Sequence, residues 1–84
     1  MPRMSDTQRK RLANNVIVAL SGEMAKQGLL RKEVEGRLPM STTTYSKRLK
    51  NPGEFTLNEL CLLSNALNTT VINLLQGRVT GLDI

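Results

Sequence analysis

The segment GLLRKEVEGRLPMSTTTYSKRLKNPGEFTLNEL, residues 28–60, decides the fold because it holds two short helical patterns separated by chain breaks. Leu30, Val34 and Leu38 recur at every fourth position, which predicts a short helix that begins at residue 30 or 31 and ends at residue 38. Pro39 ends this helix, because proline donates no backbone hydrogen bond and disfavours helical angles in the residue before it. The first half of the segment is therefore a helix followed by a tight turn.

The polar stretch between Pro39 and the Asn-Pro-Gly break at residues 51–53 predicts a second helix. Three consecutive threonines would suit a strand, but the stretch lacks the apolar alternation of a strand and is bounded by proline at both ends. We therefore expect a helix that begins after Ser41, with the Ser41 hydroxyl accepting a hydrogen bond from the amide of Thr43 or Thr44.

A longer helix precedes this segment. Apolar residues recur at every fourth position from Leu12 to Met24, which predicts an amphipathic helix over about residues 7–26. Ser5 and Gln8 have the spacing of a capping box at its start, and Gly28 supplies a C-terminal stop.

Two further helices follow the segment. Thr56 and Glu59 form a capping box, which begins a helix whose apolar set we expect to be largely buried. This set comprises Leu57, Leu60, Cys61, Leu63, Ala66 and Leu67. Asn68 suits the left-handed residue that ends the helix, and Thr70 caps a fifth helix over residues 71–76, which a glycine closes. The last residues alternate weakly and predict either a short strand or a disordered tail.

The composition favours an all-α fold. Because the chain has one Tyr, one Phe and no Trp among its 84 residues, the core must consist of aliphatic side chains at helical spacing. We expect one compact five-helix bundle.

The chain is basic. It has 12 Lys and Arg against seven Asp and Glu, which gives a formal net charge of +5. A surplus of this size suits a partner that carries negative charge, and nucleic acid is the first candidate. An ordinary basic surface on a soluble protein explains the same charge, so the charge alone does not decide between the two.

Several kinds of site are excluded by residue types that are missing or single. The chain has no His and one cysteine, Cys61, so an intrachain disulfide and His or Cys metal clusters are excluded. We assign Cys61 to the core, and Glu23 and Lys26 to the exposed surface. Since no nucleophile–base pair or phosphate-binding glycine loop is present, we expect no enzyme activity, no cofactor and no small-molecule substrate. No signal peptide or membrane span is visible, so we expect a cytoplasmic protein that does not bind a membrane.

The helix after Ser41 has two distinct faces. At 100 degrees per residue, Tyr45 and Leu49 share one side and anchor the helix to the core. The opposite side gathers Thr43, Ser46, Lys47 and Lys50. Such a face suits a DNA major groove, where Thr can contact a base edge or a thymine methyl and Lys can donate to guanine. Two short helices joined by about four residues are the arrangement of a DNA-binding helix-turn-helix.

At these residues the chain resembles the Cro/CI (XRE-type) helix-turn-helix family of phage repressors and related bacterial regulators. Gly28-Leu29 matches the pair that opens the first of the two helices, and residues 40–46, MSTTTYS, match the start of the recognition helix. The resemblance spans about residues 12–75 in helix order, and its distinctive motif covers residues 28–60. It implies a five-helix bundle of the lambda-repressor-like type.

The resemblance also implies roles for individual residues. Those that would face the bases are Thr42, Thr43, Ser46 and Lys47. Those that would lie near phosphates are Arg31, Arg48, Lys50 and Asn51. Independently of the resemblance, we also assign phosphate contacts to Lys32, beside the start of the first helix, and to Ser41, at the start of the second. Backbone amides at the start of both helices would add to the phosphate contacts. The basic run at residues 9–11 is either a second phosphate-facing patch or an exposed basic turn.

Three residues depart from the family pattern. Glu35 stands where a buried Ala is usual, Pro39 replaces the glycine of the turn, and Leu30 replaces a polar cap. A shift of the alignment by one would place Gly36 at the Ala position but would break the match in the recognition helix. We keep the unshifted register and expect a local distortion at Glu35.

These observations predict a sequence-specific regulator of transcription that binds double-stranded DNA, of the phage or prophage repressor type. Residues 7–77 would form the DNA-binding domain, after a flexible segment, residues 1–6, and before a tail, residues 78–84. We expect a homodimer on a two-fold DNA site. The two copies would be joined through helix five or through the apolar residues of the tail, which have no evident place in the bundle. The alternative is a protein-interaction module that keeps the fold and binds an anti-repressor, a toxin or a polymerase subunit.

Overall fold

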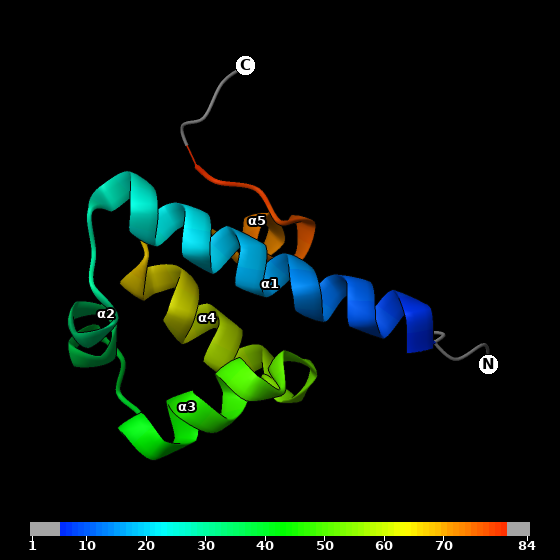
Figure 1. The fold of residues 1–84 in the computed structure, drawn as a ribbon, viewed down its shortest axis with the longest axis horizontal. Coiled ribbons are helices and arrows are strands. Elements are labelled where there is room, and N and C mark those ends of the chain that lie inside the picture. Colours follow the sequence, from blue (N-terminus) through cyan, green and yellow to red (C-terminus); the bar gives the residue numbers. More distant parts are fainter. Residues whose placement is uncertain (1–5, 81–84) are drawn as a thin grey trace.

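The structure is a computed structural model that describes residues 6–80. This part of the chain is all-helical and contains no strand, so the prediction of an all-α fold with five helices is confirmed (Figure 1). The elements are α1 (Asp6–Gln27), α2 (Arg31–Arg37), α3 (Thr42–Lys50), the 3-10 turn η1 (Pro52–Glu54), α4 (Leu57–Ala66) and α5 (Val71–Gln76). Ser5 and the last four residues, which include Leu82 and Ile84, lie outside the described residues.

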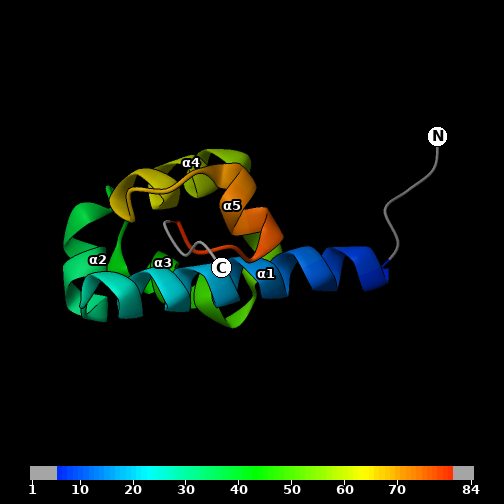
Figure 2. The same ribbon diagram turned by 90° about the horizontal axis from the view of Figure 1, so that it is seen from above.

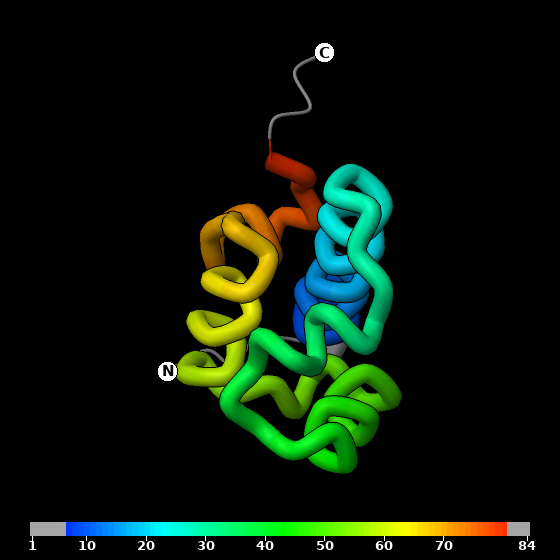
Figure 3. Tube along the Cα trace, turned by 90° about the vertical axis from the view of Figure 1, so that its left-hand side faces the viewer, coloured from blue at the N-terminus to red at the C-terminus, as the bar shows by residue number. Residues whose placement is uncertain are grey.

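The long helix α1 is the element on which the others are assembled. It packs most extensively against α5 and also contacts η1, while α4 packs against α5. Figure 2 shows α1 along one side of the molecule with α4 and α5 on the other, and α2 beside the C-terminal end of α1. Figure 3 shows α3 at the edge opposite residues 78–80. The third helix therefore has only one side turned toward the bundle.

The core is aliphatic except for one aromatic ring. α1 contributes Val16, Ala19 and Leu20, and Tyr45 of α3 is the buried aromatic residue, with 1% of its surface exposed. The other buried apolar residues are Val34, Leu38, Leu60, Leu63, Ala66, Leu67 and Leu74. Because every helix places at least one side chain in this cluster, the hydrophobic effect holds all five together.

The helix ends follow the predicted local signals. The Ser41 hydroxyl accepts from the amide of Thr44 at 3.1 Å, and both halves of the capping box that precedes α4 are formed. Left-handed backbone angles occur at Gly28, Asn68 and Gly77, which follow α1, α4 and α5. These ends were predictable because each depends on residues within four positions of one another.

α4 is less buried than its apolar pattern predicts. Leu57 is 71% exposed and Cys61 is also exposed, which corrects the assignment of both to the core. Leu60, Leu63 and Leu67 face the bundle instead. Leu57 and Cys61 are four residues apart and share a flank of the helix next to the buried side. The apolar set covers more of the circumference of α4 than the neighbouring helices can reach.

Glu23 is wholly buried, which corrects its assignment to the surface. Its carboxylate accepts from the amide of Thr80 at 2.6 Å and from Gln27 Nε2 at 3.1 Å, and it lies 3.1 Å from Lys26 Nζ. Burial by itself raises the pKa of this carboxyl, but the hydrogen bonds from Thr80, Lys26 and Gln27 outweigh it and lower the pKa to about 2. Glu23 is therefore a charged group that joins α1 to the end of the described chain.

Residues 78–80 lie along α1, so the expectation that the apolar tail has no place in the bundle is wrong for Val79. This side chain approaches Gly22 so closely that a Cβ added to Gly22 would lie 2.2 Å from Val79 Cγ2. Lys26 Nζ also donates to the carbonyl of Thr80, and the Thr69 and Thr80 hydroxyls lie 2.7 Å apart. This part of the tail forms no strand and belongs to the packed domain.

Candidate nucleic-acid interface

α2 and α3 form a pair joined by residues 38–41. Val34 of α2, Leu38 of the connection and Tyr45 of α3 are all buried, so both helices are held by apolar side chains on their inner sides. Pro39 is exposed, and α2 ends before it as predicted. The inner side of α3 is fixed by the Tyr45 ring, which leaves the outer side of the helix to solvent.

The residues predicted to face bases lie on that outer side, with one exception. Thr42, Thr43 and Lys47 are exposed, whereas Ser46 is half-buried. Ser46 Oγ accepts a hydrogen bond from Arg31 Nη2 at 2.5 Å. The two threonines stand at the N-terminus of α3, and Lys47 lies more than one turn further along. Ser46 is thus engaged by α2, while the other three side chains form one exposed strip.

Arg31 makes contacts with two helices. Its Nε donates to Glu35 Oε2 at 2.9 Å within α2, and its guanidinium lies 5.7 Å from the centroid of the Tyr45 ring on α3. Burial raises the pKa of the Tyr45 hydroxyl, with Arg31 lowering it and Glu35 raising it further. Arg31 thus joins α2 to α3 through Ser46 and Tyr45. The phosphate contact predicted for Arg31 would be a second role besides this structural one.

No break occurs at Glu35, where we expected a distortion. α2 is continuous from Arg31 to Arg37, and the Glu35 side chain is turned outward enough to pair with Arg31. The fully buried residue of α2 is Val34. The helix accommodates the Glu35 carboxylate because Val34, and not Glu35, occupies the buried position, and because Arg31, one turn away, pairs with the carboxylate.

The predicted phosphate contacts divide into two groups. Lys32, Ser41, Lys50 and Asn51 are exposed. Arg48 is drawn toward the start of α4 instead, where its Nε lies 2.9 Å from Glu59 Oε1 and its Nη1 lies 3.8 Å from Glu54 Oε2. The bond from Arg48 lowers the pKa of Glu59. Arg48 therefore joins α3 to α4, and part of its charge is paired with Glu59 and Glu54.

The two helix N-termini differ as anion sites. At α2 the Glu33 carboxylate accepts from the backbone amide of Leu30 at 3.0 Å, which places a negative charge where a phosphate would bind. At α3 the first turn contains no acidic residue, and Ser41 Oγ is occupied by the amide of Thr44. The amides at the start of α3 are therefore better suited to a phosphate than those of α2.

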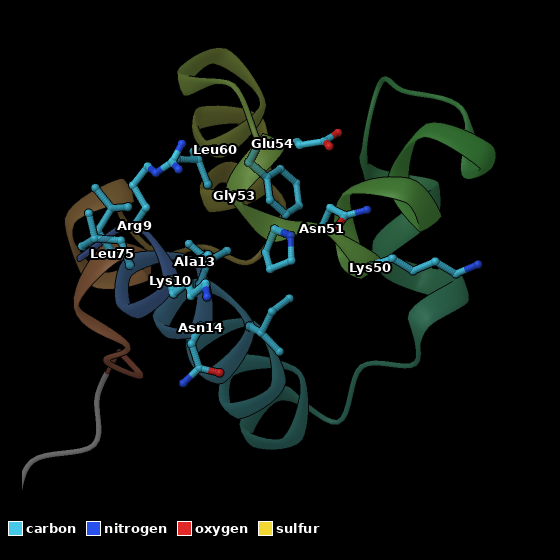
Figure 4. A pocket seen from close by; sticks show the side chains of 15 residues that line it. Arg9, Lys10, Ala13, Asn14, Lys50, Asn51, Gly53, Glu54, Leu60 and Leu75 are labelled. Carbon is cyan, nitrogen blue, oxygen red and sulfur yellow. The ribbon is translucent and has the colours of Figure 1, made fainter. Parts of the chain in front are cut away.

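A feature that sequence reasoning missed lies beside α3. A cavity of about 760 Å³ opens between the first half of α1, the end of α3, η1, Phe55 and α5. Figure 4 shows Arg9 and Lys10 at one side of it and Lys50 at the other, with Ala13 between them. The basic run at residues 9–11 was the only part of this cavity that the sequence pattern marked. The cavity could not be predicted, because its walls come from segments far apart in the chain.

Comparison of the chain with protein-family models, with curated proteins and with solved structures found no match in any of the three. Among residues 6–80 no three acidic, Cys or His side chains come together as a metal site would require. None of the helices in the same part of the chain combines the length and apolar character needed to cross a membrane.

Proposed function

We propose that this protein is a sequence-specific regulator of transcription that binds double-stranded DNA through a helix-turn-helix formed by α2 and α3. The proposal rests mainly on the outer side of α3, where Thr42, Thr43, Lys47 and Lys50 are exposed on a helix whose inner side is held by the buried Tyr45. An exposed helix with hydroxyls at its N-terminus and cations toward its C-terminus suits a major groove.

In the proposed mechanism α3 enters the major groove, where Thr42, Thr43 and Lys47 contact base edges. Lys32, Lys50 and Asn51 contact phosphates on the two sides of the groove, and these contacts fix the orientation of the helix. Bound at a promoter in the cytoplasm, the protein would block or recruit polymerase without a cofactor and without catalysing a reaction. Its resemblance to the Cro/CI family supports the same role.

A single α3 reads only a few base pairs, so we propose a homodimer on a two-fold site. Ile72 of α5 is 66% exposed and is the described apolar residue best placed to join two copies through α5. Val79 is less suited, because it already packs against Gly22 within the chain.

The test is a selection of bound duplexes from a random pool, followed by titration of the selected duplex at several salt concentrations. We expect a two-fold consensus and an affinity that falls steeply with salt, with a slope of about −0.9 in log K against log salt for each phosphate neutralised. Absence of binding near physiological salt, or binding without this slope, would refute the proposal. In that case the protein-interaction alternative would become the better explanation of the fold.

A further inference from the structure

We propose that the cavity between α1, η1 and α5 is a docking site for an acidic peptide segment of another protein, which inserts apolar side chains between the basic residues of the rim. The cavity lies next to the C-terminal end of α3 and shares Lys50 and Asn51 with the surface proposed to contact DNA, while its other walls come from α1, η1, α4 and α5 (Figure 4). This inference does not depend on DNA binding.

The floor of the cavity is apolar and incompletely covered. Leu12, Ala13, Ile17, Phe55 and Leu75 line it, and each is only partly buried by the rest of the described chain. Its volume of about 760 Å³ lies within the range of roughly 300–1,000 Å³ that is usual for ligand pockets in proteins. An occupant with apolar side chains would therefore remove a contiguous apolar surface from water.

The rim of the cavity is basic. Lys10 and Lys50 are exposed at its edge, together with Arg9, and Glu54 is the acidic residue in its lining. The Glu54 carboxylate lies 3.8 Å from Arg48, which offsets its charge. Asn14 and Asn51 add exposed amides that can bond to a peptide backbone. Positive charge around an apolar floor is complementary to a segment that carries carboxylates beside apolar anchors.

The same features disfavour two other occupants. DNA phosphates would pair with the lysines but would leave the apolar floor in contact with water. A second copy of this chain, meeting the cavity through a two-fold axis, would bring a second set of Lys10 and Lys50 against the first. An acidic segment of a different protein would cover the apolar floor with its apolar side chains and would pair its carboxylates with the basic residues of the rim.

Gly53 allows the cavity to be blocked without straining the backbone. A Cβ added to Gly53 would lie 4.0 Å from the Cβ of Ala13, which is an ordinary contact, and the backbone of Gly53 is not left-handed. Gly53→Phe would therefore place a ring across the cavity, whereas Gly53→Ala changes the same position and leaves the cavity open. The two variants are a matched pair.

The experiment is a selection of 12-residue peptides displayed on phage against the wild-type protein, followed by fluorescence anisotropy with a labelled synthetic peptide of the enriched sequence. We expect enrichment of Asp and Glu together with Leu, Ile or Phe. Gly53→Phe should weaken binding about tenfold or more, and Gly53→Ala by less than about twofold. Lys10→Glu with Lys50→Glu should weaken binding about tenfold and reduce its dependence on salt. Circular dichroism checks that each variant is folded.

Three results would overturn the inference: enrichment of no sequence or of a basic one, equal affinity of the two Gly53 variants, or full affinity of the double Lys variant. NMR shifts of the cavity methyls that depend on protein concentration alone would assign the cavity to a second copy. Tighter peptide binding after deletion of residues 1–5 would assign it to the chain's own N-terminus. Either outcome would also overturn the inference. The peptide-binding experiment contains no DNA, so a failure of this inference can be distinguished from a failure of the proposed DNA-binding function.

Discussion

Arg31 links two helices through contacts that the sequence pattern does not reveal. The guanidinium bonds to Ser46 on α3, lies over the Tyr45 ring, and pairs with Glu35 on its own helix. A planar group with several donors can make these contacts together, whereas a lysine cannot. If α3 is the helix that contacts the bases, Arg31 holds α3 in position. This role would come in addition to a contact between Arg31 and a DNA phosphate.

We therefore expect Arg31→Lys to retain nonspecific DNA binding but to lower the affinity ratio between the selected duplex and a random one about tenfold. The lysine keeps the charge and loses the contacts to Ser46 and Tyr45. Arg31→Ala should weaken both affinities and cost about 1 kcal/mol of stability. The measurements are titrations with both duplexes and urea unfolding. An unchanged ratio in Arg31→Lys would mean that Arg31 acts only as a charge.

Glu23 predicts a pH dependence of stability. Its pKa is lowered from 4.5 to about 2, so the folded state favours the carboxylate. The stabilisation is complete above about pH 4.5 and is lost as the pH falls toward 2; it is on the order of 3 kcal/mol at neutral pH.

Glu23→Gln should lower the free energy of unfolding at pH 7 and should flatten its decrease between about pH 4.5 and pH 2 relative to the wild type. Urea unfolding at a series of pH values measures both effects. Glu54→Gln is the control, because Glu54 is exposed and should shift the curve by less than about 0.5 kcal/mol. Parallel curves for wild type and Glu23→Gln would contradict the assignment.

At the scale of elements, α3 has residues with separate tasks. Tyr45 and the partly buried Leu49 hold the helix to the bundle, Arg48 ties its end to α4, and the outer residues are exposed. Lys50 and Arg48 were both predicted to contact phosphates, yet their surroundings differ. Within this one helix, the structure thus separates side chains that are paired inside the bundle from side chains that are exposed to solvent.

Arg48→Ala should lower the free energy of unfolding, since it removes the partner of Glu59, and should change DNA affinity little. Lys50→Ala should do the opposite, weakening DNA binding and leaving stability within about 0.5 kcal/mol. Urea unfolding and DNA titration of both variants check the pair. A large loss of DNA affinity in Arg48→Ala at unchanged stability would place Arg48 at the phosphates after all.

The outer side of α3 is tested by Thr43→Ala combined with Lys47→Ala. Both side chains are exposed, so the fold should remain while discrimination between the selected and random duplexes is lost. Arg78→Ala removes one exposed charge outside α2 and α3 and is the control, with discrimination retained. Full discrimination by the double variant would show that α3 is not the reading helix.

At the scale of the whole molecule, residues 78–80 close the bundle against α1. Val79 fills the space beside Gly22, and Thr80 supplies the amide that Glu23 accepts. A glycine inside a long helix costs up to about 1 kcal/mol relative to alanine, so its presence is explained by this close contact.

Gly22→Ala should therefore destabilise the protein by about 1 kcal/mol, because the new methyl displaces Val79 and this cost exceeds the gain in helix propensity. Gly36→Ala is the matched control: it lies inside α2 with nothing within 4 Å of an added Cβ, so it should stabilise by roughly 0.5–1 kcal/mol. Adding Val79→Ala to Gly22→Ala should recover part of the loss. Thermal unfolding measures all three, and stabilisation by Gly22→Ala alone would disprove the contact.

The sequence by itself determined the helices and their ends, because helical periodicity, capping residues and left-handed stops act within about four residues. It also indicated the exposed side of α3, since Tyr45 and Leu49 mark the buried one. Glu23 lies four residues after Ala19, so the helical spacing places it on the buried side of α1. The spacing does not reveal Thr80, whose amide bonds to the buried carboxylate and offsets the cost of burying it.

Only the tertiary structure decided which side of α4 is buried, which cations are paired within the chain and where the cavity lies. Each depends on residues distant in sequence: Glu23 and Thr80 are 57 positions apart, and Arg31 and Ser46 are 15 apart. Contacts at such distances follow from how the helices pack and leave no periodic trace in the sequence. The sequence pattern therefore predicted the helices, and their packing determined which charged side chains are paired within the described chain.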